Sequence, residues 1–282
     1  MPRFSISQVT TLPQGFDDDL GTYAAAGAEG IGLWELKLPR RGDTVTLERV
    51  RESGLVVTNC IPAVPSILPM PGFEEPRDPG ERVERIGASI RRFAPFEPAS
   101  IVCLTGAAGA REALLEGLRS VAEEGERAGV PIGLEPLQPL LQRDWTQTTT
   151  PEEALALLDE AGTDAVGLVF DSWNLWNDED ILEDIAEHGD RIVAVHVSDW
   201  REPTRSWADR ALPGEGSIDL ASLVRALDDA GWRGYYDLEI FSDDGSFGDD
   251  FEDSLWKADP LEVARRGREG FLAAWDAAMR DA

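Results

Sequence analysis

Four apolar stretches between residues 132 and 240 are interrupted by polar side chains that could bind a cation. These side chains are Glu135, Asp171, His196 and Glu239. Histidine is scarce, with two among 282 residues, so an imidazole inside an apolar run stands out. An isolated acid in such a run is costly to bury unless it is paired or binds a cation. We therefore predict that the four side chains share one cation.

The predicted ligand set contains three carboxylates, one imidazole and no thiolate. These mostly hard donors favour one divalent ion, Mn²⁺ first and Mg²⁺ or Co²⁺ as alternatives, over a closed structural zinc site. An ion with open positions can bind two adjacent substrate oxygens and stabilise the enediolate of a hydroxyketone. Glu135 and Glu239 flank the ion and are predicted to remove and return the proton beside the carbonyl. His196 is expected to be a ligand rather than a base, because its lone pair is occupied.

Short apolar strands alternate with helical segments along the whole chain. The expected strands span 4–10, 30–38, 55–61, 99–104, 132–137, 165–170, 192–198 and 235–241. The expected helices span 16–27, 47–53, 82–93, 110–128, a segment that opens at Thr150, 180–188, 220–230 and 261–279. Eight such strand–helix units predict an α/β fold with a parallel sheet closed into a (β/α)8 TIM barrel. No linker interrupts the pattern, so we expect a single domain over residues 1–282.

The four polar residues fall at or near the ends of the fifth to eighth expected strands. In (β/α)8 barrels the C-terminal strand ends face the mouth of the active site. Alternation along each strand then places Gly133, Val169, Ala194 and Asp237 on the inward faces of the same strands. Four consecutive strands are therefore expected to direct their ligand atoms at one point.

The chain carries a net charge of −28, and its lysines are Lys37 and Lys257. Such a field repels nucleic-acid phosphates and disfavours a highly phosphorylated substrate. No apolar run is long enough to span a membrane, and the first residues lack the apolar core of a signal peptide. Cys60 and Cys103 lie in apolar runs, which is typical of free thiols in a reducing compartment. We expect a cytoplasmic protein that binds neither nucleic acid nor membrane.

Several motifs that centre on these residues also carry a family resemblance. The motifs are Gly-Leu-Glu135-Pro, Phe-Asp171-Ser-Trp-Asn174, His196-Val-Ser-Asp, Arg210-Ala-Leu-Pro-Gly-Glu-Gly216 and Asp-Leu-Glu239-Ile. In this order they resemble the sugar phosphate isomerase/epimerase superfamily, the xylose-isomerase-like TIM barrels, which includes ketose 3-epimerases and hydroxypyruvate isomerase. The resemblance implies that the four polar residues bind one divalent metal, that the two glutamates act as acid and base, and that Arg210 contacts substrate oxygens.

Two positions depart from the family pattern. Many relatives carry a histidine where this chain has Asn174, and others carry one in the loop around Gln138. Amide side chains keep hydrogen bonding but do not titrate near neutral pH, which disfavours a mechanism with a second histidine base. We expect both amides to contact substrate. Arg201 and Arg205 compete with Arg210 for the substrate role, and all three could instead be solvated surface charges.

Other candidate substrate contacts lie at strand exits. Glu35 either hydrogen-bonds a substrate hydroxyl or braces the barrel. Trp34 and Trp173 are expected to stack on the C–H faces of a sugar, with rim packing or a homo-oligomer interface as the alternative. His188 is interpreted as a helix C-terminal residue, where the helix dipole explains it. The acidic loop 242–253 is interpreted as a mobile lid, because its spacing does not match a calcium-binding loop.

We expect an enzyme that isomerises or epimerises a small ketose or related keto-polyol. Proton abstraction beside a ketone also permits β-elimination, as in inosose dehydratases and relatives that cleave C-glycosides of keto sugars. A non-catalytic sugar-binding subunit that retains the metal is a third class. A phosphodiesterase of the endonuclease IV type is disfavoured, because its three-zinc site needs more than two histidines. Specificity depends on loops 62–80, 138–150, 200–218 and 242–258, whose composition identifies neither the sugar nor its phosphorylation state.

Overall fold

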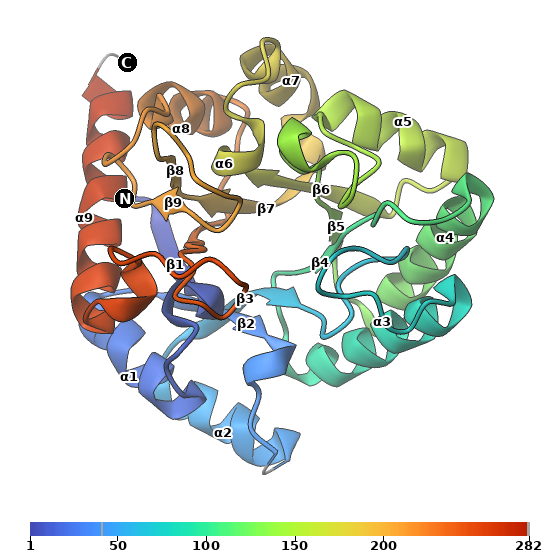
Figure 1. The fold of residues 1–282 in the computed structure, drawn as a ribbon, viewed down its shortest axis with the longest axis horizontal. Helices are drawn as coiled ribbons and strands as arrows, with labels where there is room; N and C mark the ends of the chain where they lie inside the picture. Colours follow the sequence, from blue (N-terminus) through green and yellow to red (C-terminus); the bar gives the residue numbers. More distant parts are fainter. Residues whose placement is uncertain (41, 281–282) are drawn as a thin grey trace.

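Eight parallel strands form a closed barrel in the computed structural model, which describes residues 1–40 and 42–280. Around the barrel the strands follow the order β1-β10-β7-β6-β5-β4-β3-β2. Their bounds are β1 (Arg3–Ser7), β2 (Gly30–Trp34), β3 (Val56–Ile61), β4 (Ser100–Cys103), β5 (Ile132–Leu134), β6 (Val166–Asp171), β7 (Ile192–Val197) and β10 (Tyr235–Leu238). Helices surround the barrel on its outside (Figure 1). The predicted α/β class and closed (β/α)8 barrel are confirmed.

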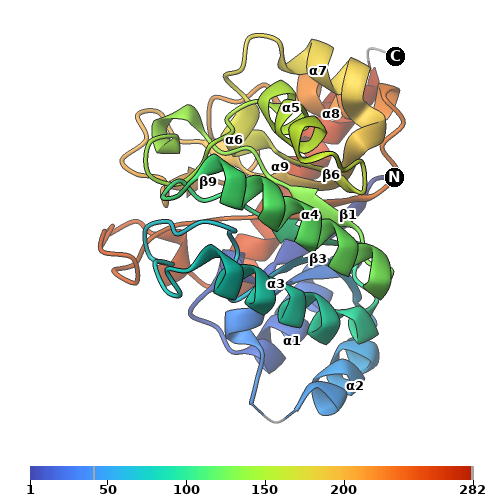
Figure 2. The same cartoon turned by 90° about the vertical axis from the view of Figure 1, so that its right-hand side faces the viewer.

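A long helix follows each barrel strand and packs its apolar face on the sheet. The helices are α1 (Phe16–Ala26), α2 (Asp43–Ser53), α3 (Pro79–Phe93), α4 (Arg111–Ala128), α5 (Pro151–Ala161), α7 (Ile181–His188), α8 (Leu220–Asp229) and α9 (Pro260–Arg280). α3 begins at Pro79 rather than at Arg82, because the Asp78 carboxylate accepts a hydrogen bond from the Glu81 N–H and caps the helix. Figure 2 shows that the long loops gather at one end of the barrel and that the N-terminus lies at the other end.

Four expected strands end at least three residues early: β1 ends at Ser7, and the other three give way to segments that carry candidate site residues. β2 ends at Trp34, and a 3-10 helix over Glu35–Lys37 replaces the rest of the expected strand. β5 ends at Leu134, shortly before Pro136, whose ring has no N–H to donate to a strand ladder. β10 ends at Leu238. The chain therefore leaves the sheet just where its polar side chains begin.

Further short elements do not follow from the sequence pattern. They are a 3-10 helix over Gln8–Thr11, the one-turn helix α6 (Ser172–Leu175), and a hairpin of β8 (Asp199–Trp200) with β9 (Arg210–Ala211). Each is shorter than the window over which hydrophobic periodicity is informative. The β8–β9 hairpin lies outside the barrel ladder and carries Arg210.

The barrel interior is filled by side chains on the predicted inward faces. Val169 and Ala194 point inward and pack with Val102 in one apolar cluster. Gly133 leaves room for its neighbour, since a Cβ atom there would lie 2.6 Å from Cγ2 of Val169. A larger residue at Gly133 would have to displace that packing.

Asp237 also points inward, where it accepts hydrogen bonds from residues on β3. Thr58 Oγ1 donates over 3.0 Å and Asn59 Nδ2 over 2.9 Å, both to Oδ2 of Asp237. Burial raises the pKa of Asp237 to about 6. This polar group connects opposite sides of the barrel.

Two further sequence expectations can be compared with the described residues. Cys60 and Cys103 are buried and unpaired. In residues 1–40 and 42–280, none of the helices has the length and apolar character needed to cross a membrane.

Arg82 ties the loop between β3 and α3 to the barrel. Its side chain is fully buried, and its guanidinium donates to Ser66 O (2.8 Å), Phe73 O (2.8 Å), Pro76 O (3.0 Å) and Ser66 Oγ (2.7 Å). Burial lowers the pKa of Arg82 to about 10, so the group stays charged at neutral pH. The Arg82 guanidinium therefore satisfies the hydrogen-bonding needs of several loop carbonyls.

Replacing Arg82 by methionine is expected to lower the free energy of unfolding by about 2–4 kcal/mol, because buried carbonyls lose their donors. Urea unfolding followed by circular dichroism measures the change. The matched control is Arg85→Met on the same helix, whose side chain is 55% exposed and pairs with Glu81. The control should change stability by less than about 0.5 kcal/mol. Equal effects of the two substitutions would contradict the role of Arg82.

Candidate active site

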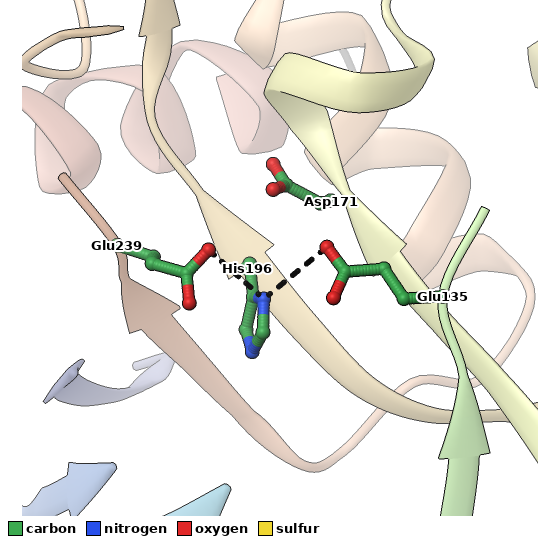
Figure 3. A group of neighbouring side chains, drawn as sticks. All are labelled: Glu135, Asp171, His196 and Glu239. Carbon is green, nitrogen blue, oxygen red and sulfur yellow. Dashed lines mark ion pairs between the residues drawn. The ribbon is translucent and has the colours of Figure 1, made fainter. Parts of the chain in front are cut away.

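The four predicted ligands lie at the C-terminal ends of four consecutive barrel strands. Glu135 follows β5, Asp171 ends β6, His196 lies in β7 and Glu239 follows β10. Parallel pairing aligns Asp171 with His196 on neighbouring strands. All four side chains are buried, and one ligand atom of each lies within 4.8 Å of the others. Figure 3 shows the four side chains converging from their separate segments.

The imidazole of His196 lies between the two glutamates. Its Nδ1 atom is 3.4 Å from Glu239 Oε2 and 3.9 Å from Glu135 Oε1. Nδ1 is buried and has no hydrogen-bond partner within the described part of the chain. A buried nitrogen without a partner is costly, and a cation among these atoms would remove that cost. The orphaned nitrogen and the three carboxylates fit a divalent metal ion, so the cluster can bind one.

Arg210 extends from β9 into the same cluster. Its Nη1 atom donates to Asp171 Oδ2 (2.8 Å) and lies 3.3 Å from Glu239 Oε2. The guanidinium carbon also lies 4.9 Å from the ring centroids of Trp173 and Phe241. Of the three arginines that the sequence left as candidates, the structure brings Arg210 to the cluster.

The other two arginines lie outside the cluster. Arg201 and Arg205 both form ion pairs with Asp209 and Asp253. These pairs hold the loop after β7 against the acidic loop 242–253. Arg201 and Arg205 therefore have structural partners, whereas the substrate role of Arg210 stays a prediction.

The two residues that depart from the family pattern, Asn174 and Gln138, have different hydrogen-bond partners. Asn174 Nδ2 donates to Glu135 Oε1 (2.9 Å) and to Asp171 Oδ2 (3.0 Å), so it orients two candidate ligands. Gln138 instead donates from its side chain to Trp173 O (3.3 Å) and Asn177 Oδ1 (3.1 Å). Its backbone N–H donates to Asn174 Oδ1. The amide of Gln138 is thus used to position neighbouring residues, and its expected contact with substrate stays a prediction.

Glu35 braces the barrel, the second of its two sequence-based alternatives. Its carboxylate accepts hydrogen bonds from Ala63 N (2.8 Å), Ser89 Oγ (2.6 Å) and Arg92 Nη1 (3.0 Å). These donors connect the end of β2 to the loop after β3 and to α3. These contacts support the bracing alternative, and a contact of Glu35 with substrate stays a prediction.

A cavity of about 90 Å³ lies against the cluster. Glu135, Asn174, Arg210 and Glu239 contribute its polar lining. Trp34 and Trp173 also line it, where the sequence predicted sugar-stacking rings. Sequence reasoning missed other aromatic residues of the wall, which are Phe73, Trp207, Phe241 and Phe247. Three of them belong to loops that the sequence marks as specificity loops, but nothing in their spacing indicates a cavity.

The acidic loop 242–253 supplies Phe247 to the cavity wall. Asp243 organises this loop by accepting hydrogen bonds from the backbone N–H groups of Gly245 (3.0 Å), Phe247 (2.9 Å) and Asp249 (2.7 Å). The Asp243 carboxylate is thus used within the loop rather than for an ion. Phe247 is the residue of this loop in the cavity lining, and the function of the loop as a mobile lid stays a prediction.

Residues 21–273, most of the chain, match the family model described as xylose isomerase-like TIM barrel. The chain belongs to this family. The resemblance predicted from the sequence motifs is confirmed, and the cluster of this xylose isomerase-like barrel lies at the strand ends where barrel enzymes place their chemistry.

Three known proteins show the range of similarity. 3-Dehydroshikimate dehydratase of Pseudomonas aeruginosa is 28% identical over 259 residues, which cover 85% of this chain and 37% of that protein. D-psicose 3-epimerase of Enterocloster bolteae is 28% identical over 134 residues, which cover 47% of this chain and 41% of that protein. The matched parts thus span less than half the length of either relative. Protein SMc04130 of Sinorhizobium meliloti 1021 has a crystal structure that matches with a TM-score of 0.83 and 27% identity, over 96% of this chain and 98% of that one.

In the metal-free cluster of this xylose isomerase-like barrel, the pKa values of several side chains are strongly shifted. Burial raises the pKa of Glu135 to about 8, and the charges of Glu239 and Asp171 add to this effect. Burial disfavours a charged imidazole at His196, but the carboxylates of Glu239 and Glu135 outweigh it and raise its pKa to about 10. Burial also disfavours an ionised Glu239, yet His196 and Arg210 hold its pKa below the ordinary value. A divalent ion must therefore displace protons from Glu135 and His196 when it binds.

Without metal, the protein is expected to lose roughly 5 °C in Tm as the pH rises from about 7 to about 9.5. The folded-state pKa values of Glu135 and His196 lie above their ordinary values, so the folded state holds protons that it loses across this range. Differential scanning fluorimetry of chelator-treated protein measures the shift, and Glu135→Gln should reduce it. A metal-free Tm that stays constant or rises with pH would contradict these pKa values.

Proposed function

We propose that this barrel is a divalent-metal-dependent enzyme that isomerises or epimerises a small ketose or related keto-polyol. The observation that carries the proposal is the pair of buried glutamates on two sides of His196, within one cluster of ligand atoms. Glu135 and Glu239 have pKa values shifted in opposite directions, the pattern expected of an acid and a base. The partial similarity to D-psicose 3-epimerase supports the same chemistry.

In this proposal Glu135, Asp171, His196 and Glu239 hold the ion, for which Mn²⁺ is the first candidate. When bound, the ion supplies a Lewis acid that holds adjacent substrate oxygens and makes the proton beside the carbonyl more acidic. Glu239 removes that proton from one face of the carbon, and Glu135 returns a proton that it has first taken up from solvent. Reversing their roles runs the reaction backwards.

Other residues of the site orient the substrate and exclude water. Arg210 and Asn174 line the cluster end of the cavity. In this proposal they donate hydrogen bonds to substrate oxygens there. The aromatic side chains over the rest of the wall keep water away from the carbanion-like state.

We also propose a cytoplasmic monomer or homo-oligomer of one domain, which size-exclusion chromatography with light scattering would test.

A survey of solvent proton exchange tests the proposed function. Purified protein loaded with Mn²⁺ is incubated with a panel of ketoses in D₂O, and NMR follows the loss of the C–H signal beside each carbonyl. Exchange above the uncatalysed rate, with product of unchanged mass, is the expected result. If no member of a broad panel exchanges, the protein is a sugar-binding module instead.

β-Elimination is the second candidate function. It is favoured by the similarity to 3-dehydroshikimate dehydratase, which extends over 85% of this chain. The same proton abstraction at Glu239 would start it, but expulsion of the leaving group needs an acid, and Asn174 and Gln138 cannot supply one. Mass spectrometry of the products separates the two functions. Stoichiometric loss of water or another group would show elimination and contradict isomerisation.

A further inference from the structure

The cavity is polar at the cluster end and apolar over the rest of its wall. Of its 18 lining residues, 14 are apolar, and seven of those are aromatic. The four polar ones are Glu135, Asn174, Arg210 and Glu239, which contact one another or the candidate ligands. One buried water needs about 10–15 Å³, so a cavity of this volume holds on the order of six to nine waters. That is roughly the space of one ring with its substituents.

Several donors of the polar side chains are already used within the cluster. Arg210 Nη1 donates to Asp171, and Asn174 Nδ2 donates to Glu135 and Asp171. A polyhydroxylated ketose would place several further hydroxyls against the apolar wall. Each hydroxyl that leaves water without a new partner weakens binding. The wall therefore disfavours a molecule that carries hydroxyls along its whole length.

The charge at the cavity also disfavours a phosphorylated ligand. Arg210 is the one cationic side chain among the described lining residues, and Asp171 and Glu239 already neutralise it. The chain as a whole has a net charge of −28. A phosphate group would meet here one arginine, whose charge is already balanced by two carboxylates, and no lysine.

Trp207 is the centre of an aromatic group at the apolar end. Its ring centroid lies 4.7 Å from that of Trp145, 5.3 Å from that of Phe241 and 5.1 Å from that of Phe247. These rings come from three different loops over the barrel mouth, outside the strands of the barrel. Phe247 remains 39% exposed in a loop that is otherwise rich in aspartate. Trp207 and Trp145 pack against core side chains with part of their surface, and all these rings line the cavity, where they offer flat apolar surface to a ligand.

We propose that the substrate is an uncharged hydroxyketone whose far end carries an aromatic or hydrocarbon group. Its adjacent oxygens lie at the metal-ligand cluster, and its apolar group lies against Trp207, Trp145 and Phe247. The proposal rests on the proposed function for the chemistry and adds the class of substrate. Among ketoses and keto-polyols, it favours those with an apolar end over those that carry hydroxyls or a phosphate along their whole length.

The test compares 2-hydroxyacetophenone with dihydroxyacetone and dihydroxyacetone phosphate, using the Mn²⁺-loaded protein. NMR follows proton exchange in D₂O, and each rate is divided by the uncatalysed rate of the same probe. The aromatic probe should show a kcat/KM at least about tenfold higher than dihydroxyacetone. Trp207→Ala should remove most of this preference, because kcat/KM of the aromatic probe should fall several-fold more than kcat/KM of dihydroxyacetone. Leu140→Ala is the matched control, because Leu140 is 52% exposed and lies outside the cavity lining.

Isothermal titration calorimetry with the same probes separates the substrate class from the chemistry. Tighter binding of 2-hydroxyacetophenone than of dihydroxyacetone supports the apolar substrate class, even if neither probe exchanges its proton. Absence of exchange would overturn the proposed function and not the substrate class. Equal or weaker binding of the aromatic probe, or a preference for dihydroxyacetone phosphate, overturns the substrate class. Circular dichroism verifies folding, and Phe247→Ala replaces Trp207→Ala if the latter does not fold.

Discussion

Replacing Glu239 by glutamine is expected to lower substrate proton exchange by about 10³-fold. Glu239 lies 3.4 Å from His196 Nδ1 and 3.3 Å from Arg210 Nη1, and these cations hold its pKa below the ordinary value. The carboxylate is therefore ionised and can accept a proton at neutral pH. Glutamine retains the size and one ligating oxygen but cannot act as a base. NMR measurement of exchange in D₂O at saturating Mn²⁺ tests this prediction.

Glu35→Gln is the matched control for this substitution. Glu35 is likewise largely enclosed, but its carboxylate accepts from Ala63 and Ser89 away from the cavity. The control should keep the exchange rate within about twofold. Metal analysis of the Glu239→Gln protein shows whether a ligand as well as a base has been lost. If exchange persists within about tenfold, or if both variants lose it equally, Glu239 is not the base.

Removal of divalent metal is expected to abolish exchange altogether, and re-addition of Mn²⁺ should restore it. Metal at a hundred times its Kd should also raise the free energy of unfolding by about 2.7 kcal/mol relative to the metal-free protein. The reason is that His196 Nδ1 is buried without a hydrogen-bond partner in the described chain, and that carboxylate oxygens of three neighbouring side chains lie close enough to share one ion with it. Chelation followed by exchange assays and thermal unfolding measures both effects.

Asp171→Asn separates a specific site from adventitious binding. Asp171 accepts from Arg210 and Asn174, so its amide variant keeps the shape of the cluster and removes one negative charge. Metal affinity should fall at least about tenfold, whereas Asp244→Asn in the exposed part of the acidic loop should leave it unchanged. Undiminished exchange in protein with metal well below stoichiometric amounts would contradict a metal-dependent reaction. Comparing Mn²⁺, Mg²⁺ and Co²⁺ in the restoration tests the proposed preference for Mn²⁺.

The sequence was sufficient to predict the barrel and the convergence of the four candidate ligands. Regular alternation of strands and helices leaves few architectures, and parallel strands bring all their C-terminal ends to one mouth. A polar residue at the same place in four successive strands therefore meets the other three. Glu135, Asp171, His196 and Glu239 could be brought together on this argument alone, although their function as ligands stays a prediction.

The partners of the remaining polar side chains could not be read from the sequence. Glu35 and Gln138 are near the same strand ends as the ligands, yet Glu35 reaches α3 and Gln138 reaches Trp173 and Asn177. Which donor lies within hydrogen-bond range depends on how helices and loops pack, and no local pattern encodes that. The short β8–β9 hairpin that carries Arg210 was missed for the same reason.

What the sequence by itself determined is the periodic part of this protein: its strands, its helices and the polar residues at the strand ends. Tertiary structure alone determined the character of the cavity. Phe73, Trp145, Trp207 and Phe247 come from separate loops and form one apolar wall only after folding. Periodicity reports which face of an element is buried, whereas a wall built from loops arises from contacts between residues far apart in the chain.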